Sequence, residues 1–272
     1  MTRPVPALSE LSVTELVALA RVGFLPHGLV VGSAIYSAGT QYDWTVATRE
    51  VFPLSDAMRT ARFLALGRMR EQAVQVGAEG VVDVRLEVEH HLWRGAHRVA
   101  KFVALGTAVG FDPAHAPPEL RASPSLRLAN GAPFLSDLTG PDFVTLLGAG
   151  YRPVALAMGT CVYGLDAREL RAYRGTDTEI TSYTQAFFDA RETAMARLQQ
   201  DLFTELPPGH PDAPTGIVGM TVTEATYGGQ ASQGPPIVEF NAVGTAVAPI
   251  RPDDPRRART RVRPQLVVPL DG

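Results

Sequence analysis

The sequence GFLPHGLVVGSAIY, at Gly23–Tyr36, returns later in the chain as GYRPVALAMGTCVY, at Gly150–Tyr163. The match extends upstream without a gap to Leu11 and Leu138. Identical residues occupy eight aligned positions: Leu11/Leu138, Val17/Val144, Leu19/Leu146, Gly23/Gly150, Pro26/Pro153, Leu29/Leu156, Gly32/Gly159 and Tyr36/Tyr163. A match of this length inside one chain predicts two copies of one folding unit.

A short helix is predicted before each copy. Ser12 and Glu15 have the spacing of a capping box, in which the hydroxyl and the carboxylate bond backbone amides of the first turn. Thr139 and Asp142 take the same places in the second copy. The first glycine of each copy suits the position just after a helix end. We therefore expect both short helices to stop where the repeated stretch begins.

The repeated stretch itself predicts a strand over Leu29–Tyr36 and another over Leu156–Tyr163, each with an internal glycine that indicates a bulge or a close backbone approach. A long helix is predicted next, over 55–76, because apolar residues recur at helical spacing there. The corresponding stripe in the second copy runs from 187 to 202, and Ser182 with Gln185 predicts its capping box. Arg62, Arg68, Arg70 and Glu71 fall mostly off this apolar stripe.

Two strands are predicted after each long helix: 80–90 and 98–111 in the first copy, and the segments from 216 and over 237–247 in the second. Alternation places Val82, Val84, Leu86 and Val88 on one face. The predicted organisation is a lead-in (1–10), a first unit (11–111), a linker (112–137), a second unit (138–250) and a flexible Arg- and Pro-rich C-terminal arm (251–272). The fold class is α+β.

Composition narrows the possible functions. The net charge is −3, and the arginines of the arm leave the rest of the chain more acidic, so we expect no nucleic-acid binding. No apolar run is long enough to span a bilayer, and no secretory signal is apparent, so we expect no membrane insertion. Cys161 is the single cysteine, which suits a reducing cytoplasm. We expect that thiol to be buried and inert.

The ordered set of motifs resembles the YbjQ family, which carries a heavy-metal-binding label. The matching residues are Gly28–Gly32, Gly77–Arg85 and Gly106–Val109. The second copy repeats the sequence GTAV of Gly106–Val109 at Gly244–Val247, and it keeps Gly216–Met220. It lacks a counterpart of Gly77 and Ala78, so it is a diverged copy. The resemblance implies dodecin-like β-α-β-β units, each a small antiparallel sheet packed on a long helix, and assembly into rings that are typically pentameric.

Physical reasoning agrees that the units need partners. A three-stranded sheet on one helix has little core, and its edges and second face stay open. Small residues repeated at matched positions indicate tight packing across a sheet or a ring seam. The candidate interface residues are Gly106, Thr107, Ala108 and Val109, with Gly244, Thr245, Ala246 and Val247.

Metal binding has one weak set of candidates: Glu89, His90, His91 and His97. His90 and His91 are adjacent, so a strand points them to opposite faces, and the second copy has no equivalent ligands. A polar hairpin tip is the preferred interpretation, so no metal, cofactor or catalytic residue is assigned. Asp83 stands where the second copy has Gly219, and it is either an interface charge or an edge-protecting one.

The C-terminal arm ends in an apolar tip, Leu266, Val267, Val268 and Leu270, which is either a docking peptide for a protein partner or part of a solubilising tail. The preferred function is a non-enzymatic, cytoplasmic scaffold or binding protein that assembles with itself into a homo-oligomeric, pentameric ring. The alternative is a protein that binds a metal or small ligand at unit interfaces.

Overall fold

The computed structural model describes residues 8–37, 48–93, 97–173, 177–227 and 236–256. The first unit contains α1 (Val13–Ala20), β1 (Phe24–Ser37), α2 (Phe52–Gln75), β3 (Gly80–Trp93) and β4 (His97–Phe111). This order of elements is the predicted one, although β1 begins earlier and α2 starts three residues sooner than expected.

The second unit repeats the first with α3 (Gly140–Gly148), β6 (Tyr151–Gly164), α5 (Thr181–Glu205), β7 (Gly216–Tyr227) and β8 (Ile237–Pro249). In both units the last strand lies in the middle, and the pairings β1–β4, β3–β4, β6–β8 and β7–β8 are all antiparallel. The predicted fold class, two tandem β-α-β-β units with a sheet packed on a long helix, is confirmed.

Four short elements, one inside each unit and two in the linker, were not predicted. They are β2 (Arg49–Glu50), η2 (Pro118–Leu120), β5 (Phe134–Leu135) and α4 (Ala167–Ala172). The two short strands extend the sheets to the orders β1-β4-β3-β5 and β2-β6-β8-β7. Thus β2, which belongs to the first unit, completes the sheet of the second, and β5 from the linker completes the sheet of the first.

The helix boundaries follow local chemistry. Ser12 caps α1 in the predicted capping box, and Thr139 caps α3 by accepting a hydrogen bond from the amide of Asp142. Gly23 and Gly150 have φ of 82° and 87°, the left-handed conformation that ends a helix. The capping box predicted at Ser182 is wrong, because its hydroxyl bonds Glu169 and α5 begins without a side-chain cap.

Glycine inside β1 and β6 lets each long helix approach its sheet closely. A Cβ at Gly32 would lie 1.8 Å from the carbonyl oxygen of Ala65, and one at Gly159 would lie 1.9 Å from that of Ala194. The helix residues at these contacts are fully buried alanines. The predicted close backbone approach is confirmed in both units.

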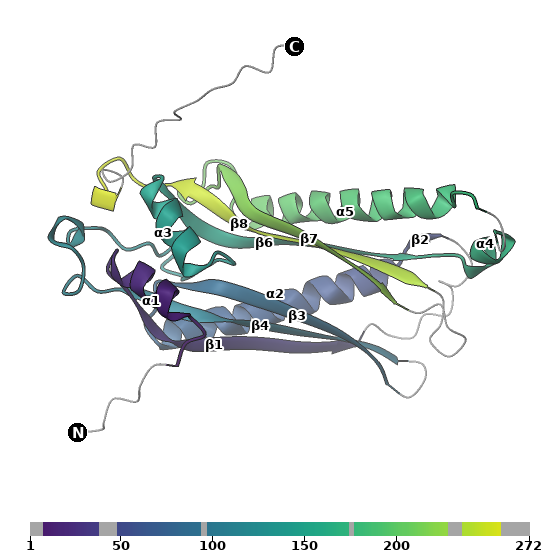
Figure 1. Ribbon diagram of the computed structural model, residues 1–272, viewed down its shortest axis with the longest axis horizontal. Coiled ribbons are helices and arrows are strands. Elements are labelled where there is room, and N and C mark those ends of the chain that lie inside the picture. The colour runs from purple at the N-terminus through teal and green to yellow at the C-terminus, as the bar shows by residue number, and fades with distance from the viewer. Residues whose placement is uncertain (1–7, 38–47, 94–96, 174–176, 228–235, 257–272) are drawn as a thin grey trace, which may run out of the picture.

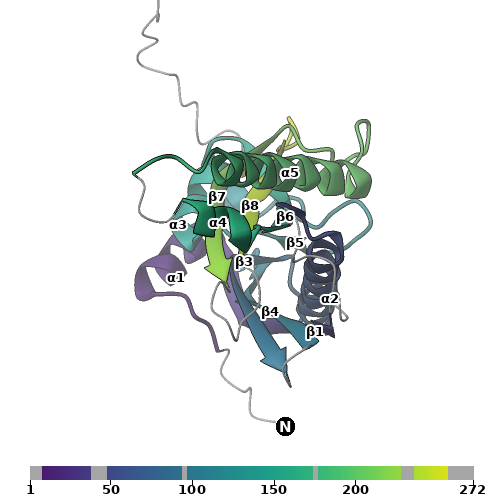
Figure 2. The same cartoon turned by 90° about the vertical axis from the view of Figure 1, so that its right-hand side faces the viewer.

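The two units stack so that the sheets lie one above the other (Figure 1). The helix α2 packs on β1 and β4 and also contacts β6, while α5 packs on β6 and β8. Seen end-on, α5 forms an outer layer above its sheet, and α2 lies at one side of the lower sheet (Figure 2). The main core therefore joins the units: Leu156 and Met158 of β6 belong to the same cluster as Ala61, Ala65 and Met69 of α2.

One detail of β3 differs from the prediction. A bulge between Val82 and Arg85 shifts the register against β4, and Asp83 at the bulge has φ of 52°. The extra residue changes which side chains share a face, so Val84 packs in the core with α2 whereas Val82 packs with Phe24 in another cluster. The predicted single face for Val82 and Val84 is therefore wrong. In the described part of the chain, no helix is long and apolar enough to cross a membrane.

Candidate assembly surfaces

The seam between the two units shows how one unit of this fold attaches to another. Its centre is the segment 134–138, which runs along the edge of β3. Phe134 and Ser136 donate their amides to the carbonyl oxygens of Glu79 and Val81, at 3.2 and 3.0 Å. This segment therefore acts as an added parallel strand that pairs the edge of the first sheet.

The bulge in β3 turns two further amides toward the same segment. Asp83 donates to the carbonyl oxygen of Leu138 at 2.9 Å, and Val84 donates to that of Ser136 at 3.0 Å. The carboxylate of Asp83 is buried and bonds Arg85 at 2.8 Å. Asp83 thus lies at the interface between the first unit and the linker. Its backbone amide, and not its charge, makes the contact there.

Side chains of the same segment anchor it to the second unit. The hydroxyl of Ser136 lies 2.9 Å from that of Thr245 on β8, and the amide of Asp137 donates to Thr245 Oγ1 at 3.1 Å. Thr245 in turn donates to the carboxylate of Asp137. Burial raises the pKa of that carboxyl, while the Thr245 bond opposes the shift. The segment is therefore bonded to both units at once.

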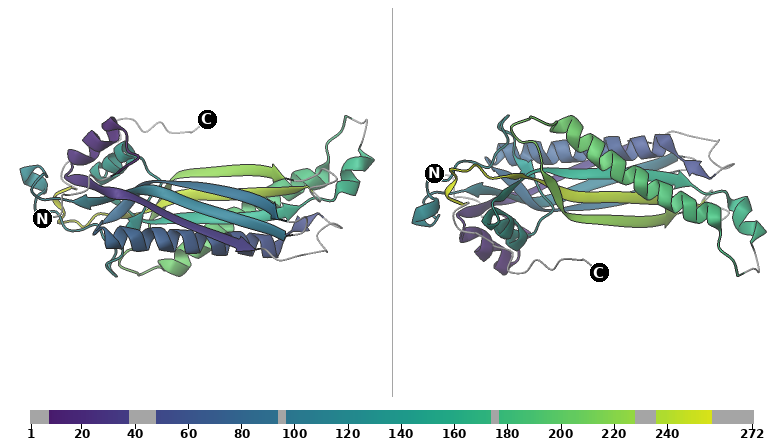
Figure 3. Two further views of the ribbon diagram at one scale, coloured as in Figure 1. Left: turned by 90° about the horizontal axis from the view of Figure 1, so that it is seen from below. Right: turned by 90° about the horizontal axis from the view of Figure 1, so that it is seen from above.

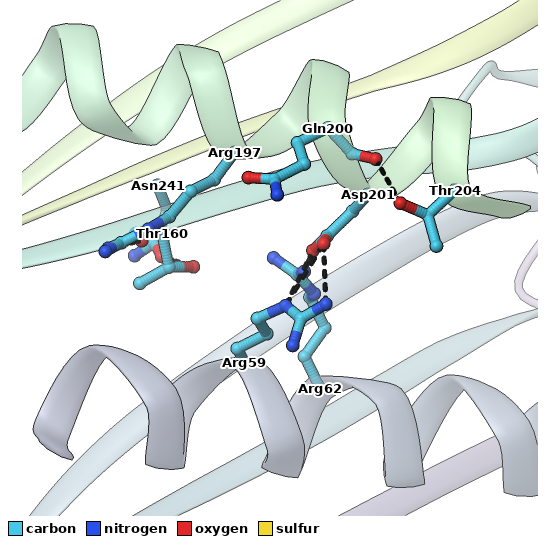
Figure 4. Close-up of polar contacts among 8 residues, drawn as sticks. All are labelled: Arg59, Arg62, Thr160, Arg197, Gln200, Asp201, Thr204 and Asn241. Atoms are coloured by element: carbon cyan, nitrogen blue, oxygen red, sulfur yellow. Dashed lines mark hydrogen bonds and ion pairs between the residues drawn. The ribbon is translucent and has the colours of Figure 1, made fainter. Parts of the chain in front are cut away.

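Polar contacts also join the two long helices, where Asp201 of α5 accepts hydrogen bonds from two arginines of α2 (Figure 4). The Arg59 and Arg62 nitrogens lie 2.7 Å from its carboxylate oxygens. Arg62 is 2% exposed, and desolvation lowers its pKa to about 10 despite the favourable charge of Asp201. Arg62 lies off the apolar stripe of α2 and is nevertheless buried, because Asp201, which neutralises its charge, comes from the other unit.

An open cleft of about 620 Å³ lies beside this cluster, lined mainly by Phe52, Pro53, Ser55, Asp56, Arg59, Arg197, Gln200 and Asp201. Ser55, Arg59, Arg197 and Asp201 are engaged in structural contacts. Ser55 Oγ accepts a hydrogen bond from the amide of Val162, and Arg197 pairs with Glu50 at 2.6 Å. These contacts fix β2 and β6 beside α2. The groups described around the cleft stabilise the seam between the units.

The eight GTAV residues predicted for assembly are all buried within the single chain. A Cβ at Gly106 would lie 2.8 Å from Val81, and one at Gly244 would lie 2.8 Å from Ile217, so these glycines permit close packing inside each sheet. Thr245 lies at the seam between the units. The role of these residues in contacts between chains stays a prediction.

The candidate metal ligands lie on the β3–β4 hairpin. The register pairs Glu89 with Lys101, His90 with Ala100, and His91 with Val99, while His97 pairs with Trp93. Their side chains lie outside the described part of the chain. Elsewhere in that part, no group of three or more His, Cys, Asp and Glu side chains could hold a metal ion. The assignment of no metal at the hairpin therefore stays a prediction.

Cys161 is buried in β6 and has no disulfide partner. Desolvation, with the nearby Glu50 carboxylate, raises the pKa of its thiol to about 12. A thiol with such a pKa stays protonated at neutral pH, and the thiolate is the reactive form. The expectation of a buried and inert cysteine agrees with this environment.

The C-terminal arm is packed at Asp254 and Arg256, just after β8, and the flexibility predicted for 251–272 stays a prediction. Arg256 is buried, pairs with Asp254 at 2.7 Å, and donates to the carbonyl oxygen of Pro124. Its guanidinium also lies over the ring of Phe111 at 5.9 Å. The apolar tip predicted for docking, Leu266, Val267, Val268 and Leu270, lies outside the described residues.

In contrast to the seam, several surfaces are open. The strand β7 is the last of its sheet in the described residues, and most of its side chains are exposed, including Met220 and Val222. Exposed apolar residues also lie at and before α1: Leu8, Val13, Leu16 and Val17. In Figure 3 the view from above shows β7 at the margin of the upper sheet. The exposure of these surfaces carries no signal in the sequence pattern, because it depends on which strand lies at the edge of a sheet.

Comparison with known proteins adds independent information. Residues 21–112 match a family model, YbjQ_1, described as "Putative heavy-metal-binding". The whole chain is similar to "Encapsulin nanocompartment protein Rv1762c" of Mycobacterium tuberculosis, with 34% identity over 270 residues, 97% of this chain and 92% of that protein. The chain belongs to the family of this nanocompartment protein. The family-model match confirms the YbjQ resemblance for the first unit, and the longer match carries family membership through the linker and the second unit.

Proposed function

We propose that this protein is a self-assembling structural protein, many copies of which form a closed homo-oligomeric particle in the bacterial cytoplasm. The observation that carries the proposal is the similarity over almost the whole chain to a protein named for a nanocompartment. A compartment is an enclosure, and a single chain of 29.2 kDa packed as stacked sheets and helices leaves no interior to enclose anything. The proposed role therefore requires many chains.

The surfaces of the chain support this function. Within the described residues no strand pairs with the outer edge of β7. Edges of this kind are normally covered, charged or shortened to prevent unwanted pairing. Here β7 is 12 residues long and carries exposed Met220 and Val222. An edge of this kind is suited to pairing with another protein chain.

A non-enzymatic role fits the chemistry of the described residues. The cleft beside α2 and α5 is lined by charges that pair with one another across the seam, and the Cys161 thiol is buried with a raised pKa. The paired charges join elements of the two units. The finer assignment of a pentameric ring rests on the family resemblance and forms part of the proposal.

The test is the mass and shape of the purified, untagged chain. Mass photometry and negative-stain electron microscopy are expected to show uniform closed particles many times heavier than 29.2 kDa. Particles with fivefold features would support the pentameric arrangement. A single species at the mass of one chain across the micromolar range would refute self-assembly as the function.

A further inference from the structure

The segment that covers the edge of β3 has a second copy in the sequence. Residues 133–138 read PFLSDL, and residues 6–11 read PALSEL, at the same spacing as the repeated stretch that follows them. Within the described residues, Leu8, Ser9 and Leu11 match Leu135, Ser136 and Leu138, and Glu10 stands in place of Asp137. The copy at 134–138 is bonded to a sheet edge, whereas Leu8, Ser9 and Glu10 of the other copy are exposed.

We propose that Leu8–Leu11 of one chain adds as a strand to the open edge of β7 in a second copy of the same protein. The contact would repeat the one that Leu135–Leu138 makes with β3 inside a single chain. This inference rests on the proposed function, since it names the surfaces through which the copies join. It predicts a head-to-tail contact, in which the first unit of one copy attaches to the second unit of another.

The backbone of β7 is already shaped for such a strand. Gly219 has φ of 64° and occupies the position of Asp83, and both strands are bulged at this point. In β3 this bulge aims the amides of Asp83 and Val84 at the added segment. The equivalent donors in β7 are the amides of Gly219 and Met220.

The register of the contact follows from the repeat. Met220 and Gly219 would donate their amides to the carbonyl oxygens of Ser9 and Leu11, as Val84 and Asp83 do to Ser136 and Leu138. Ser9 would donate its own amide to the carbonyl oxygen of Ile217. Main-chain bonds of this kind supply affinity when a segment extends a sheet, while the alternate side chains supply specificity.

Side-chain exposure shows the same asymmetry on the first unit. Four apolar residues that are exposed there have equivalents in the second unit that are buried, because the second unit is docked on the first. The pairs, with the exposed fraction of each residue, are Leu8 71% and Leu135 1%, Leu16 40% and Phe143 0%, Val31 36% and Met158 4%, and Ile35 69% and Val162 0%.

The reverse asymmetry appears at the other end of the stack. Phe24 is fully buried and packs edge-on against Phe143 at 5.1 Å, whereas its equivalent Tyr151 is 41% exposed. Val84 is buried, whereas its equivalent Met220 is 47% exposed. The first unit therefore exposes one side of the contact that is formed at the seam inside the chain, and the second unit exposes the other side. Two copies are thus complementary in a head-to-tail orientation.

A buried polar atom supports the same arrangement. Thr107 and Thr245 are equivalent threonines of the two GTAV segments, and both are fully buried. Thr245 bonds Ser136 and Asp137, whereas the hydroxyl of Thr107 has no hydrogen-bond partner among the described residues. Docking of the exposed segment would bring Ser9 to Thr107, as Ser136 is brought to Thr245, and would satisfy this group.

The partner is a second copy rather than the same chain. Leu11 leads directly into α1, which packs against α3 and so keeps Leu8–Leu11 on the first unit. The second unit adds its leading segment to the edge strand of the first unit. For Leu8–Leu11 to do the same, a further unit must stand before the first one. One chain holds only two units, so this further unit belongs to another copy. Such a heterologous contact gives a ring if the rotation closes.

The test is disulfide crosslinking between two differently tagged, co-expressed full-length chains, one carrying Leu8→Cys and the other Ile217→Cys. Both carry Cys161→Ala, which inserts the residue that the first unit has at Ala34. Parallel pairing of Val81 with Leu135 sets the matched positions, and a single chain with Val81→Cys and Leu135→Cys is the positive control. We expect a heterodimer on non-reducing gels, well above the crosslinking of either variant alone.

A second experiment does not depend on added cysteines. Leu8→Asp is expected to abolish the assembled species and leave a chain of 29.2 kDa with an unchanged circular dichroism spectrum, because Leu8 is exposed in the single chain. Ser9→Pro removes the amide donated to Ile217 and should have the same effect. The control Glu10→Gln keeps both the leucine and the amide, and it should assemble normally.

The outcomes separate this inference from the proposed function. Particles that form without the 8–217 crosslink, and that tolerate Leu8→Asp, would overturn the inference and leave self-assembly intact. The specific crosslink in short head-to-tail oligomers that never close would support the inference and refute the closed particle. A wild-type chain that stays single, together with cysteine variants that give no 8–217 crosslink, would refute both.

Discussion

The equivalent strands β3 and β7 show what the duplication changed. Both carry the same bulge and pair with their central strands in the same register. The edge of β3 is covered by Phe134–Leu138, and its residues Val81, Val82 and Val84 are buried. The edge of β7 is open in the described residues. Equivalent strands are thus buried in one unit and exposed in the other. Their burial depends on whether another segment covers the edge, and not on the strand itself.

The largest expected effect sharpens this contrast at the covered edge. Leu135→Ala should lower the free energy of unfolding by about 2–5 kcal/mol, because it removes a fully buried side chain from the joint core. The matched change Leu8→Ala should alter the stability of the single chain by less than about 0.5 kcal/mol, because Leu8 is exposed. Urea denaturation at one fixed protein concentration measures both. Equal effects would contradict the assigned difference between the two edges.

A second prediction concerns the charges between the long helices. Asp201→Asn should destabilise the chain by about 3 kcal/mol, because it leaves the guanidinium of Arg62 buried without a counterion. Arg62→Met should cost less, because Asp201 keeps its bond to Arg59. Thermal unfolding of the two variants checks the order. A larger loss of stability in Arg62→Met than in Asp201→Asn would contradict the role of Asp201 as the counterion of buried Arg62.

The third prediction tests a feature that the two units share. Gly32→Ala and Gly159→Ala should each cost about 1–3 kcal/mol, because the new methyl group meets a helix carbonyl oxygen at less than 2 Å. Gly67 in α2 has open space around it, so Gly67→Ala should stabilise the chain by up to about 1 kcal/mol. Unfolding midpoints of the three variants give the comparison. A large difference between Gly32 and Gly159 would show that the two helix–sheet contacts are not equivalent.

A smaller effect is expected from pH. Burial raises the pKa of Asp137 in the folded chain, so the carboxyl contributes most to stability at low pH, and this contribution is lost as pH rises through the folded pKa. Asp137→Asn should therefore flatten the dependence of stability on pH above about 4 and be neutral or stabilising at pH 7. Glu10→Gln, at the exposed equivalent position, is the control. Denaturation curves over this range would contradict the prediction if both variants behaved alike.

The smallest effect is a chemical one. Cys161, with a thiol pKa raised to about 12 by burial, should not react with a thiol reagent at pH 8 while the chain is folded. In denaturant it should react fully. Its equivalent Ala34 shows that the site also accepts a methyl group, so Cys161→Ala should fold and assemble like the wild type. Rapid labelling of the folded chain would show that this strand opens.

Sequence patterns predicted the elements of the fold well. The capping box of Ser12 and Glu15, the glycines that end the short helices, and the close approach at Gly32 are local features, set by hydrogen bonds and sterics within a few residues. The burial of Arg62 could not be predicted from the helical pattern, because it depends on Asp201, which lies far along the chain. The bulge at Asp83 was missed because a single extra residue leaves the apolar pattern almost unchanged.

The candidate surfaces were harder to predict. The sequence analysis assigned assembly to the GTAV segments, which are buried in the single chain. It did not pick out the segment before each short helix, although PALSEL and PFLSDL were present in the sequence. The repeated hexapeptide could have indicated an assembly surface. This interpretation requires the structure, which places one of the two hexapeptides along the edge of a strand.

The amino-acid sequence alone determined the duplication, the order of helices and strands in each unit, and the need of such small units for partners, because periodicity, capping and length act locally or through composition. Only the tertiary structure decided which edge is covered. Leu8 and Leu135 are the same residue in the same motif, yet one is exposed and the other is buried. The physical reason is that burial is set by contacts between distant segments, which a local pattern does not encode.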